Sequence, residues 1–451
     1  MVGAAGGARV LSRVVGLLVR WRKSVALLTL AALVRWSQAF RRGVILLLLR
    51  SDAACLAAVR LSRLLLGSVF PAVLVPWWYP QGRHIALDEC QVLHNLRYER
   101  RLRFGPHARE LLDTLHPLAA RRGDLPEPGP LDARGVAPLV ADMALELLQH
   151  APAWAPAPQF GHEGAPELSA PAVLFGHGGG WVCDGTDVQM QQVTSIARQG
   201  YSFFLYNYPL SPEERFPRAL VSTLRALSWL KTERGHARVA LVGESAGGNL
   251  VTMAAALVRN RHLLRELARE VEEPVADWPY PDISCVVAWY SILCSEHWRG
   301  AGWLSPGLDK VFEMYRGDAL GGRMTLCDLE ADLEAYPPTM LVAGLQDPLG
   351  LTESSRAAKA MLERKGLPVE LHCYDDTHGF VGYPPSFQQA AAGGHDYWRD
   401  NARDAMRRTT AFLDRHHKKP AQTSRRRSAS AETLQAPPPM DKDDLEDGIT
   451  F

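Results

Sequence analysis

The sequence has almost no net charge, few cysteines and no glycosylation signal, and each shortage argues against a class of protein. In 451 residues, 50 Lys and Arg face 49 Asp and Glu, so the formal charge is +1 and there is no bulk attraction to nucleic acid. No Asn-x-Ser/Thr sequon occurs, which disfavours a secreted or luminal protein. The seven cysteines include no C-x-x-C pair, so neither a zinc cluster nor a disulfide framework has support. We therefore expect reduced, buried thiols.

Long apolar runs are also missing. A helix that spans a bilayer needs about 20 apolar residues, and the longest charge-free run, 64–82, is broken by three prolines. Residues 1–63 carry eleven basic side chains and one acid, so this segment is +10 and the rest of the chain is −9. Four basic residues share one side of a helical projection, with apolar residues over most of the remainder: Arg9, Arg13, Arg20 and Lys23.

This basic amphipathic pattern is typical of a helix that lies in a membrane interface. We predict that residues 1–82 bind an endoplasmic-reticulum or lipid-droplet membrane. Because Lys and Arg tend to stay on the cytoplasmic side, the body of the protein is expected to be cytosolic. The alternative is that the segment packs onto the body as an extra helical layer.

Residues 83–170 are predicted to form a helical and then proline-rich region that leads into the body of the protein. Within it, 93–118 has helical character and 126–171 is rich in Pro and Ala. Residues 418–451 are polar, proline-rich and acidic, so they are expected to form a disordered tail.

Short apolar runs alternate with amphipathic helical stretches between 171 and 417. This alternation is typical of an α/β fold in which helices cover both faces of a mostly parallel sheet. The predicted strands are 172–175, 203–206, 239–242, 286–290, 339–342 and 369–373. The predicted helices are 220–234, 249–261, 354–365 and 402–415. Residues 292–336 interrupt the pattern and are predicted to be a cap insertion. Four of its aromatic side chains are expected to line a pocket: Trp298, Trp303, Phe312 and Tyr315.

A nucleophile elbow is the sharpest motif in the chain. Gly243-Glu244-Ser245-Ala246-Gly247-Gly248 fits G-x-S-x-G and stands between a predicted strand and a predicted helix, as that motif requires. The glycines permit a tight turn that exposes the serine hydroxyl above the sheet. The motif therefore predicts Ser245 as a nucleophile.

A second glycine-rich loop, His177-Gly178-Gly179-Gly180-Trp181, also follows a predicted strand. Acyl transfer develops negative charge on a carbonyl oxygen, which preorganised backbone N–H groups stabilise. A phosphate-binding loop would need a following GK[ST], which the sequence lacks. We predict an oxyanion-binding loop, with His177 as a structural hydrogen-bonding residue rather than a base.

A serine nucleophile needs a base, and the base needs an orienting carboxylate. Asp347 and His378 each follow a predicted strand, in the order Ser, acid, His that α/β hydrolases use. Asp375 and Asp376 compete for the acid role but lie only two or three residues from His378, too close in the chain to reach back. The sequence therefore favours Asp347.

Over roughly residues 170–415 the chain resembles the hormone-sensitive-lipase-type branch of the α/β-hydrolase superfamily, which includes the arylacetamide deacetylases and many microbial carboxylesterases. The HGGG loop, the GESAGG elbow, the aspartate before Pro-Leu and the HGF box occur in family order. Tyr208-Pro-Leu-Ser-Pro resembles the tyrosine–proline–glutamate segment of that family, with Leu-Ser where Arg-Leu-Ala is usual. The resemblance implies the α/β-hydrolase fold with a helical cap, which would draw on part of residues 83–170 and on the insertion 292–336.

The resemblance also implies roles for individual residues. Ser245 would be the nucleophile, His378 the general base and then acid, and Asp347 its orienter. The oxyanion hole would consist of the Gly179, Gly180 and Ala246 amides, with Gly178 shaping the loop. Glu244 would be a supporting hydrogen-bonding residue rather than a second base.

These features together predict a membrane-associated serine hydrolase that cleaves lipid or other hydrophobic esters through an acyl-enzyme, without metal or cofactor. An aryl-amide deacetylase with the same triad and a catalytically idle binding protein are the alternatives. In the tail, Arg425 and Arg427 stand three residues before Ser428 and Ser430, a pattern that basophilic kinases favour. Phosphorylation there is predicted, against the alternative of an unmodified charge run.

Overall fold

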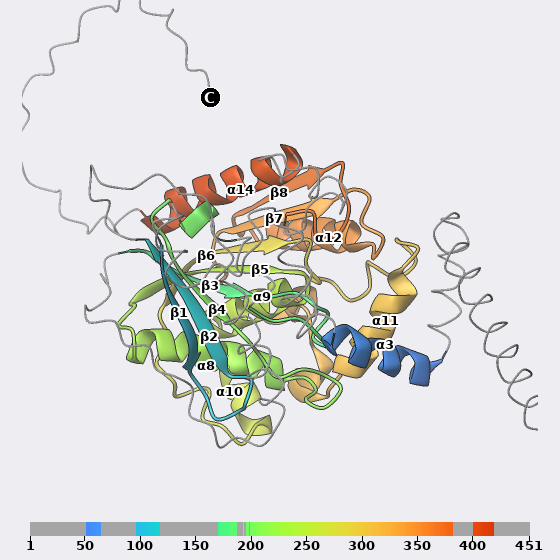
Figure 1. Ribbon diagram of the computed structural model, residues 1–451, viewed down its shortest axis with the longest axis horizontal. Helices are drawn as coiled ribbons and strands as arrows, with labels where there is room; N and C mark the ends of the chain where they lie inside the picture. The colour runs from blue at the N-terminus through green and yellow to red at the C-terminus, as the bar shows by residue number, and fades with distance from the viewer. Residues whose placement is uncertain are drawn as a thin grey trace, which may run out of the picture. The chain divides into compact units, whose positions relative to one another are not determined.

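The computed structural model describes residues 51–64, 96–117, 170–186, 193, 195–197, 199–381 and 400–418 (Figure 1). Within them, eight strands form one sheet in the order β1-β2-β4-β3-β5-β6-β7-β8. The strands are β1 (Leu96–Arg103), β2 (Leu111–Pro117), β3 (Ala172–Gly176), β4 (Ser202–Tyr206), β5 (Arg238–Glu244), β6 (Asp282–Trp289), β7 (Thr339–Gly344) and β8 (Val369–Tyr374). The six strands from β3 onward are parallel to one another, while β2 pairs antiparallel with β4 and β1 with β2. All six predicted strands are confirmed.

Alternate side chains of the central strands enter two hydrophobic clusters, one on each face of the sheet. In β5, Val239 and Leu241 belong to one cluster, and Ala240 and Val242 to the other. The first cluster includes apolar residues of α8 (Arg218–Thr232), α9 (Ser245–Arg259), α10 (Arg261–Glu270) and α12 (Leu351–Arg364). The second includes apolar residues of α14 (Asp400–Leu413), which a short π-helix, Asp414–Lys418, follows. Strands that are covered on both faces are apolar along their whole length, so these strands could be recognised in the sequence as continuous apolar runs.

The four predicted helices are confirmed as α8, α9, α12 and α14. Helix α10 was not predicted, because charged residues make up half of its sequence RHLLRELARE. Its leucines Leu263, Leu264 and Leu267 are fully buried and hold it against the first cluster.

The helix expected within 93–118 is wrong, because the described part of that segment is the β1–β2 hairpin. Gly105 and Pro106 interrupt any helix there and lie in the connection between the strands. Strand β2 is buried because it extends the sheet, with Leu112 opposite Tyr206 and Leu115 opposite Phe203. Residues 96–117 therefore extend the sheet instead of contributing to a cap.

The insertion at 292–336 contains α11 (Ser305–Tyr315) and two 3₁₀ turns, η3 (Ala319–Gly322) and η4 (Leu326–Asp332). Three of the four aromatic side chains expected to line a pocket are packed in the core instead. Trp298, Phe312 and Tyr315 are at most 2% exposed and belong to the first cluster, and Trp303 is half-buried. Large apolar rings are more stable packed together than open to solvent, so they fix the insertion to the body.

The expectation that all thiols are reduced and buried is also wrong. Cys294 and Cys327 form a disulfide, with their Cα atoms 5.0 Å apart across 33 residues of sequence. The insertion folds back on itself there, since the Cys327 N–H donates to the Leu293 carbonyl at 3.0 Å. No spacing rule predicts a pair brought together by such a fold. Cys55 and Cys285 carry buried thiols, but the thiol of Cys373 is exposed.

Helix α3 (Asp52–Leu64) is the described part of the basic N-terminal block. Asp52 pairs with Lys310 of α11 at 2.6 Å, and Cys55 and Val59, one turn apart, are each 7% exposed. Helix α3 lies beside α11 in Figure 1. Among the described helices, none has the length and apolar character to cross a membrane.

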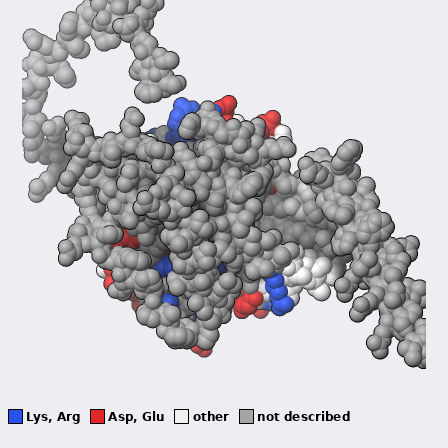
Figure 2. All heavy atoms as spheres, viewed as in Figure 1, with Lys and Arg blue, Asp and Glu red and all other residues white. Residues whose placement is uncertain are grey.

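Several predictions concern residues outside the described ranges. These are the membrane-associating stretches 1–50 and 65–82, the Pro-rich region 118–169, and the tail 419–451 with Ser428 and Ser430. On the face drawn in Figure 2, both blue basic and red acidic side chains of the described part are visible, without one sign dominating.

Candidate active site

The serine of the G-x-S-x-G motif lies in the turn between β5 and α9. Strand β5 ends at Glu244 and α9 begins at Ser245, whose φ of 49° is uncommon for a residue other than glycine. Gly247 is required by close packing, because a Cβ atom there would lie 2.2 Å from the Gly176 carbonyl oxygen. The turn therefore seats the start of α9 directly against the end of β3.

Three side chains from three separate loops form one hydrogen-bonded line. His378 Nε2 lies 3.2 Å from Ser245 Oγ, and His378 Nδ1 lies 2.8 Å from Asp347 Oδ2. Asp347 follows β7 and His378 follows β8, so the parallel strands bring both to the sheet edge that carries Ser245. The Leu349 N–H donates to the other carboxylate oxygen of Asp347 at 2.8 Å and fixes its orientation. With Nδ1 donating to Asp347, Nε2 is left to accept the Ser245 hydroxyl proton.

The two competing acids are engaged elsewhere. Asp375 accepts a hydrogen bond from Gln346 at 2.7 Å. Asp376 accepts one from the Thr377 N–H at 2.9 Å and one from Asn401 at 3.2 Å. Within the ranges that the structure describes, no three His, Cys, Asp or Glu side chains are grouped so that they could hold a metal ion.

A second carboxyl group lies beside the histidine and shapes its titration. Burial raises the pKa of Glu244 to about 7, although the Tyr290 hydroxyl donates to this carboxyl at 2.7 Å. Burial also opposes a charge on His378, but the Asp347 carboxylate and the Glu244 charge outweigh it and raise the pKa of His378 above its ordinary value. The imidazolium form of His378 is therefore stabilised from two sides.

Tyr208 holds the carbonyl groups of the glycine-rich loop. Its hydroxyl donates to the His177 carbonyl at 2.9 Å and to the Gly178 carbonyl at 2.8 Å. The rings of Tyr208 and His177 stack with centroids 4.1 Å apart, and His177 Nδ1 donates to the Gly178 carbonyl at 2.9 Å. Because burial lowers the pKa of His177 to about 3, this ring is a neutral hydrogen-bond donor.

The same loop lies against the serine. A Cβ atom on Gly178 would lie 3.4 Å from the Cβ of Ser245, and the Gly178 amide hydrogen-bonds the Glu244 carboxyl. Gly178 was predicted to shape the oxyanion loop rather than to donate to the oxyanion, and its N–H is directed to Glu244 in this way. The remaining candidate donors are the amides of Gly179, Gly180 and Ala246.

Comparison with known proteins agrees with this geometry. A family model described as alpha/beta hydrolase fold matches residues 173–382. An ethyl acetate hydrolase of Pseudomonas putida is 30% identical over 241 residues, which are 51% of this chain and 71% of that protein. The chain belongs to the hormone-sensitive-lipase-type branch of the α/β-hydrolase superfamily. It is a carboxylic ester hydrolase.

Two other similar proteins are more distant. A carboxylesterase of Mycobacterium tuberculosis is 25% identical to this α/β hydrolase over 234 residues, 47% of this chain and 67% of that protein. The crystal structure of an inhibited esterase B from Lactobacillus rhamnosis has a TM-score of 0.53 and 18% identity, and the match covers 80% of this chain and 97% of that one. At that identity, the likeness shows a common fold.

The cap insertion of this hydrolase is fixed to the glycine-rich loop, to the Asp347 loop and to the elbow helix α9. Tyr315 stacks on Trp181, which follows the glycine-rich loop, with centroids 4.2 Å apart. The Leu304 N–H donates to the Pro348 carbonyl at 2.8 Å, next to Asp347. Asn249 of α9 donates to the carbonyls of Ile292 and Met324, at 3.1 and 2.8 Å: it joins both halves of the insertion to the elbow helix.

Sequence reasoning missed two residues of this hydrolase that support the site. Tyr290, directly after β6, binds Glu244, and its ring centroid lies 5.0 Å from that of His378. Its position at the end of a central parallel strand is a signal that could have identified it. Arg109 donates to the carbonyls of Tyr208 and Asp184, but it lies outside the matched region and no motif indicated it.

Proposed function

We propose that Ser245 is the nucleophile of this ester hydrolase, with His378 as general base and then acid, and Asp347 as its orienter. The observation that carries the proposal is the hydrogen-bonded line through the three side chains, with distances of 3.2 and 2.8 Å. As Ser245 Oγ attacks the ester carbonyl carbon, its proton passes to His378 Nε2. The C–O bond to the alcohol then breaks, and His378 gives that proton to the departing oxygen.

Water completes the cycle. His378 takes a proton from the water as its oxygen attacks the acyl-enzyme, and returns the proton to Ser245 Oγ as the carboxylic acid leaves. Negative charge on the carbonyl oxygen is stabilised by the amides of Gly179, Gly180 and Ala246 in both halves of the reaction. Since only neutral His378 accepts a proton, activity rises with pH through the raised pKa of this group.

Hydrophobic esters, lipid esters among them, are the proposed substrates. Val311 of α11 lies over the glycine-rich loop, since a Cβ atom on Gly180 would lie 2.8 Å from Val311 Cγ1. An apolar side chain next to a proposed oxyanion donor favours apolar groups around the ester carbonyl. A ladder of p-nitrophenyl esters tests this: kcat/KM is expected to rise from the acetate to longer acyl chains. A kcat/KM that falls with each increase in acyl length beyond the acetate would contradict the preference for hydrophobic esters.

The N-terminal block is proposed to place the enzyme on a membrane or lipid-droplet surface. Its support is the +10 charge of residues 1–63 and their alternation with apolar residues. Full-length protein is expected to sediment with membranes, to resist high salt and to be released by detergent. A chain beginning at Gln81 should stay in the supernatant and still hydrolyse a water-soluble ester. Full-length protein in the supernatant would contradict the proposal.

The nucleophile is tested by Ser245→Ala. We expect loss of p-nitrophenyl acetate hydrolysis and of fluorophosphonate labelling, with an unchanged circular dichroism spectrum. Ser228→Ala on α8, away from the triad, is the matched control and should keep both activities. More than a few per cent residual activity in Ser245→Ala would exclude Ser245 as the nucleophile. If the unmodified chain hydrolyses p-nitroacetanilide as fast as p-nitrophenyl acetate, the amidase alternative would be favoured.

A further inference from the structure

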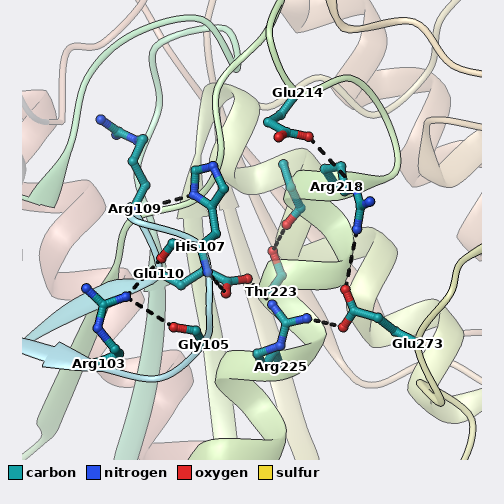
Figure 3. Close-up of polar contacts among 11 residues, drawn as sticks. Arg103, Gly105, His107, Arg109, Glu110, Glu214, Arg218, Thr223, Arg225 and Glu273 are labelled. Carbon is teal, nitrogen blue, oxygen red and sulfur yellow. Dashed lines mark hydrogen bonds and ion pairs between the residues drawn. The ribbon is translucent and has the colours of Figure 1, made fainter. Parts of the chain in front are cut away.

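The β1–β2 hairpin reaches the active-site region through one arginine. Arg109 lies in the connection between β1 and β2, where its own N–H donates to His107 Nδ1 at 3.1 Å. Its guanidinium donates through Nε to the Tyr208 carbonyl and through a terminal nitrogen to the Asp184 carbonyl, each at 2.9 Å. In Figure 3 the Arg109 side chain extends away from the contact between Arg103 and Gly105. A single rigid fork thus joins two segments that are separate in the sequence.

Both segments border the glycine-rich loop. Tyr208 is the residue whose hydroxyl holds the carbonyls of His177 and Gly178. Asp184 directly follows the turn that begins at Gly179, and a Cβ atom on Gly179 would lie 2.7 Å from the Asp184 Cβ. Arg109 therefore holds a backbone carbonyl on each side of the proposed oxyanion donors.

We propose that Arg109 is a positioning residue for the oxyanion loop, acting through the backbone of Tyr208 and Asp184. Oxyanion stabilisation requires amides held at a fixed distance from the developing charge, so a small displacement of the loop costs rate without weakening substrate binding. The family match begins at residue 173, so Arg109 brings to the site a contact from outside the matched region. The proposal rests on the proposed oxyanion hole.

The hairpin itself has attachments that do not use the Arg109 side chain. Thr186 donates to Asp113 of β2 at 2.7 Å, and the Asn207 N–H donates to the Leu111 carbonyl at 2.9 Å. Next to Arg109, the buried carboxyl of Glu110 pairs with Arg225 of α8 (Figure 3). Loss of the Arg109 side chain should therefore leave the hairpin in place.

The test is Arg109→Met in the full-length chain, with p-nitrophenyl acetate as substrate. Removal of one oxyanion-hole donor costs about 10²–10³ in kcat. Here the donors stay but are misplaced, so kcat is expected to fall about tenfold to a hundredfold, with KM changed less than about threefold. The rate of fluorophosphonate labelling should fall with kcat, because the oxyanion hole also stabilises the phosphoryl oxygen during labelling. Arg103→Met is the matched control, since that guanidinium binds the carbonyls of Gly105 and His107 in its own turn. It should keep kcat within about twofold.

A second variant and a double-mutant cycle separate positioning from general damage. Tyr208→Phe removes the hydroxyl that holds the loop, and Arg109→Met added to it should cost much less than Arg109→Met alone. If Arg109→Met does not fold, Arg109→Gln is measured in the same way. Unchanged kcat, a change in KM alone, equal losses in Arg103→Met, or full additivity with Tyr208→Phe would each overturn the proposal. These outcomes are separate from failure of the catalytic assignment, which residual activity in Ser245→Ala would reveal.

Discussion

Glu244→Gln should make the stability of the enzyme less sensitive to pH. Burial raises the pKa of Glu244 from 4.5 to about 7, so the folded state binds this proton more tightly than the unfolded chain does. The resulting stabilisation is fully present below pH 4.5 and is lost as pH rises to 7. At 1.36 kcal/mol per pKa unit, the loss is about 3 kcal/mol. Glutamine cannot ionise and can keep both contacts, because its oxygen accepts the Gly178 N–H and its amino group donates to Tyr290.

Urea unfolding at pH 5 and pH 8 measures this effect. Relative to the unmodified chain, Glu244→Gln should gain up to about 3 kcal/mol more at pH 8 than at pH 5. Glu363→Gln is the matched control, because that side chain is 53% exposed and pairs with Lys359 on the surface of α12. Its effect should be the same at both pH values. An identical effect of Glu244→Gln at both pH values would refute the reasoning, since it would show that this carboxyl ionises as readily when folded as when unfolded.

Three further changes test the site. Glu244→Gln should also move the acid limb of the kcat/KM profile to lower pH, because it removes a charge that raises the pKa of His378; a limb that stays in place would contradict this. Asp347→Asn should lower kcat by about 10³–10⁴, and steady-state kinetics should show much smaller losses for Asp375→Asn and Asp376→Asn; the reverse ranking would refute the assignment. Val311→Ala should raise kcat/KM for branched acyl esters relative to the acetate, whereas Glu313→Ala on the exposed face of α11 should not; no change in that ratio would exclude Val311 as a wall of the site.

The residues in the hydrogen-bonded line could be predicted because each has a local signature. Ser245 stands in a strand–turn–helix motif, and Asp347 and His378 follow apolar runs that are recognisable as buried strands. Parallel strands then bring the three loops together without further information. The hairpin at 96–117 was missed because the basic residues of β1 conceal its alternation, while Gly105 and Pro106 were the overlooked signal.

Contacts between residues that are far apart in the sequence could not be predicted from local sequence patterns. Arg109 and Tyr208 are 99 residues apart and join through a backbone carbonyl, which any residue provides. The Cys294–Cys327 pair and the contact of Tyr290 with Glu244 likewise depend on how the insertion and β6 are placed. Aromatic residues occur both in pockets and in cores, so the sequence did not show which environment holds Trp298, Phe312 and Tyr315.

The close approach of Gly247 to Gly176 limits how this enzyme can change during evolution. Backbone touches backbone at that point, so even a methyl group on Gly247 would force the elbow away from the end of β3. The loop that carries the nucleophile and the loop proposed to bind the oxyanion cannot change position independently, because their backbones are in contact. Val311, by contrast, is a partly exposed side chain of the insertion, so its size can change while the strands stay in register. Diversification toward new esters is therefore expected to accumulate in the insertion, with the sheet edge beneath it held constant.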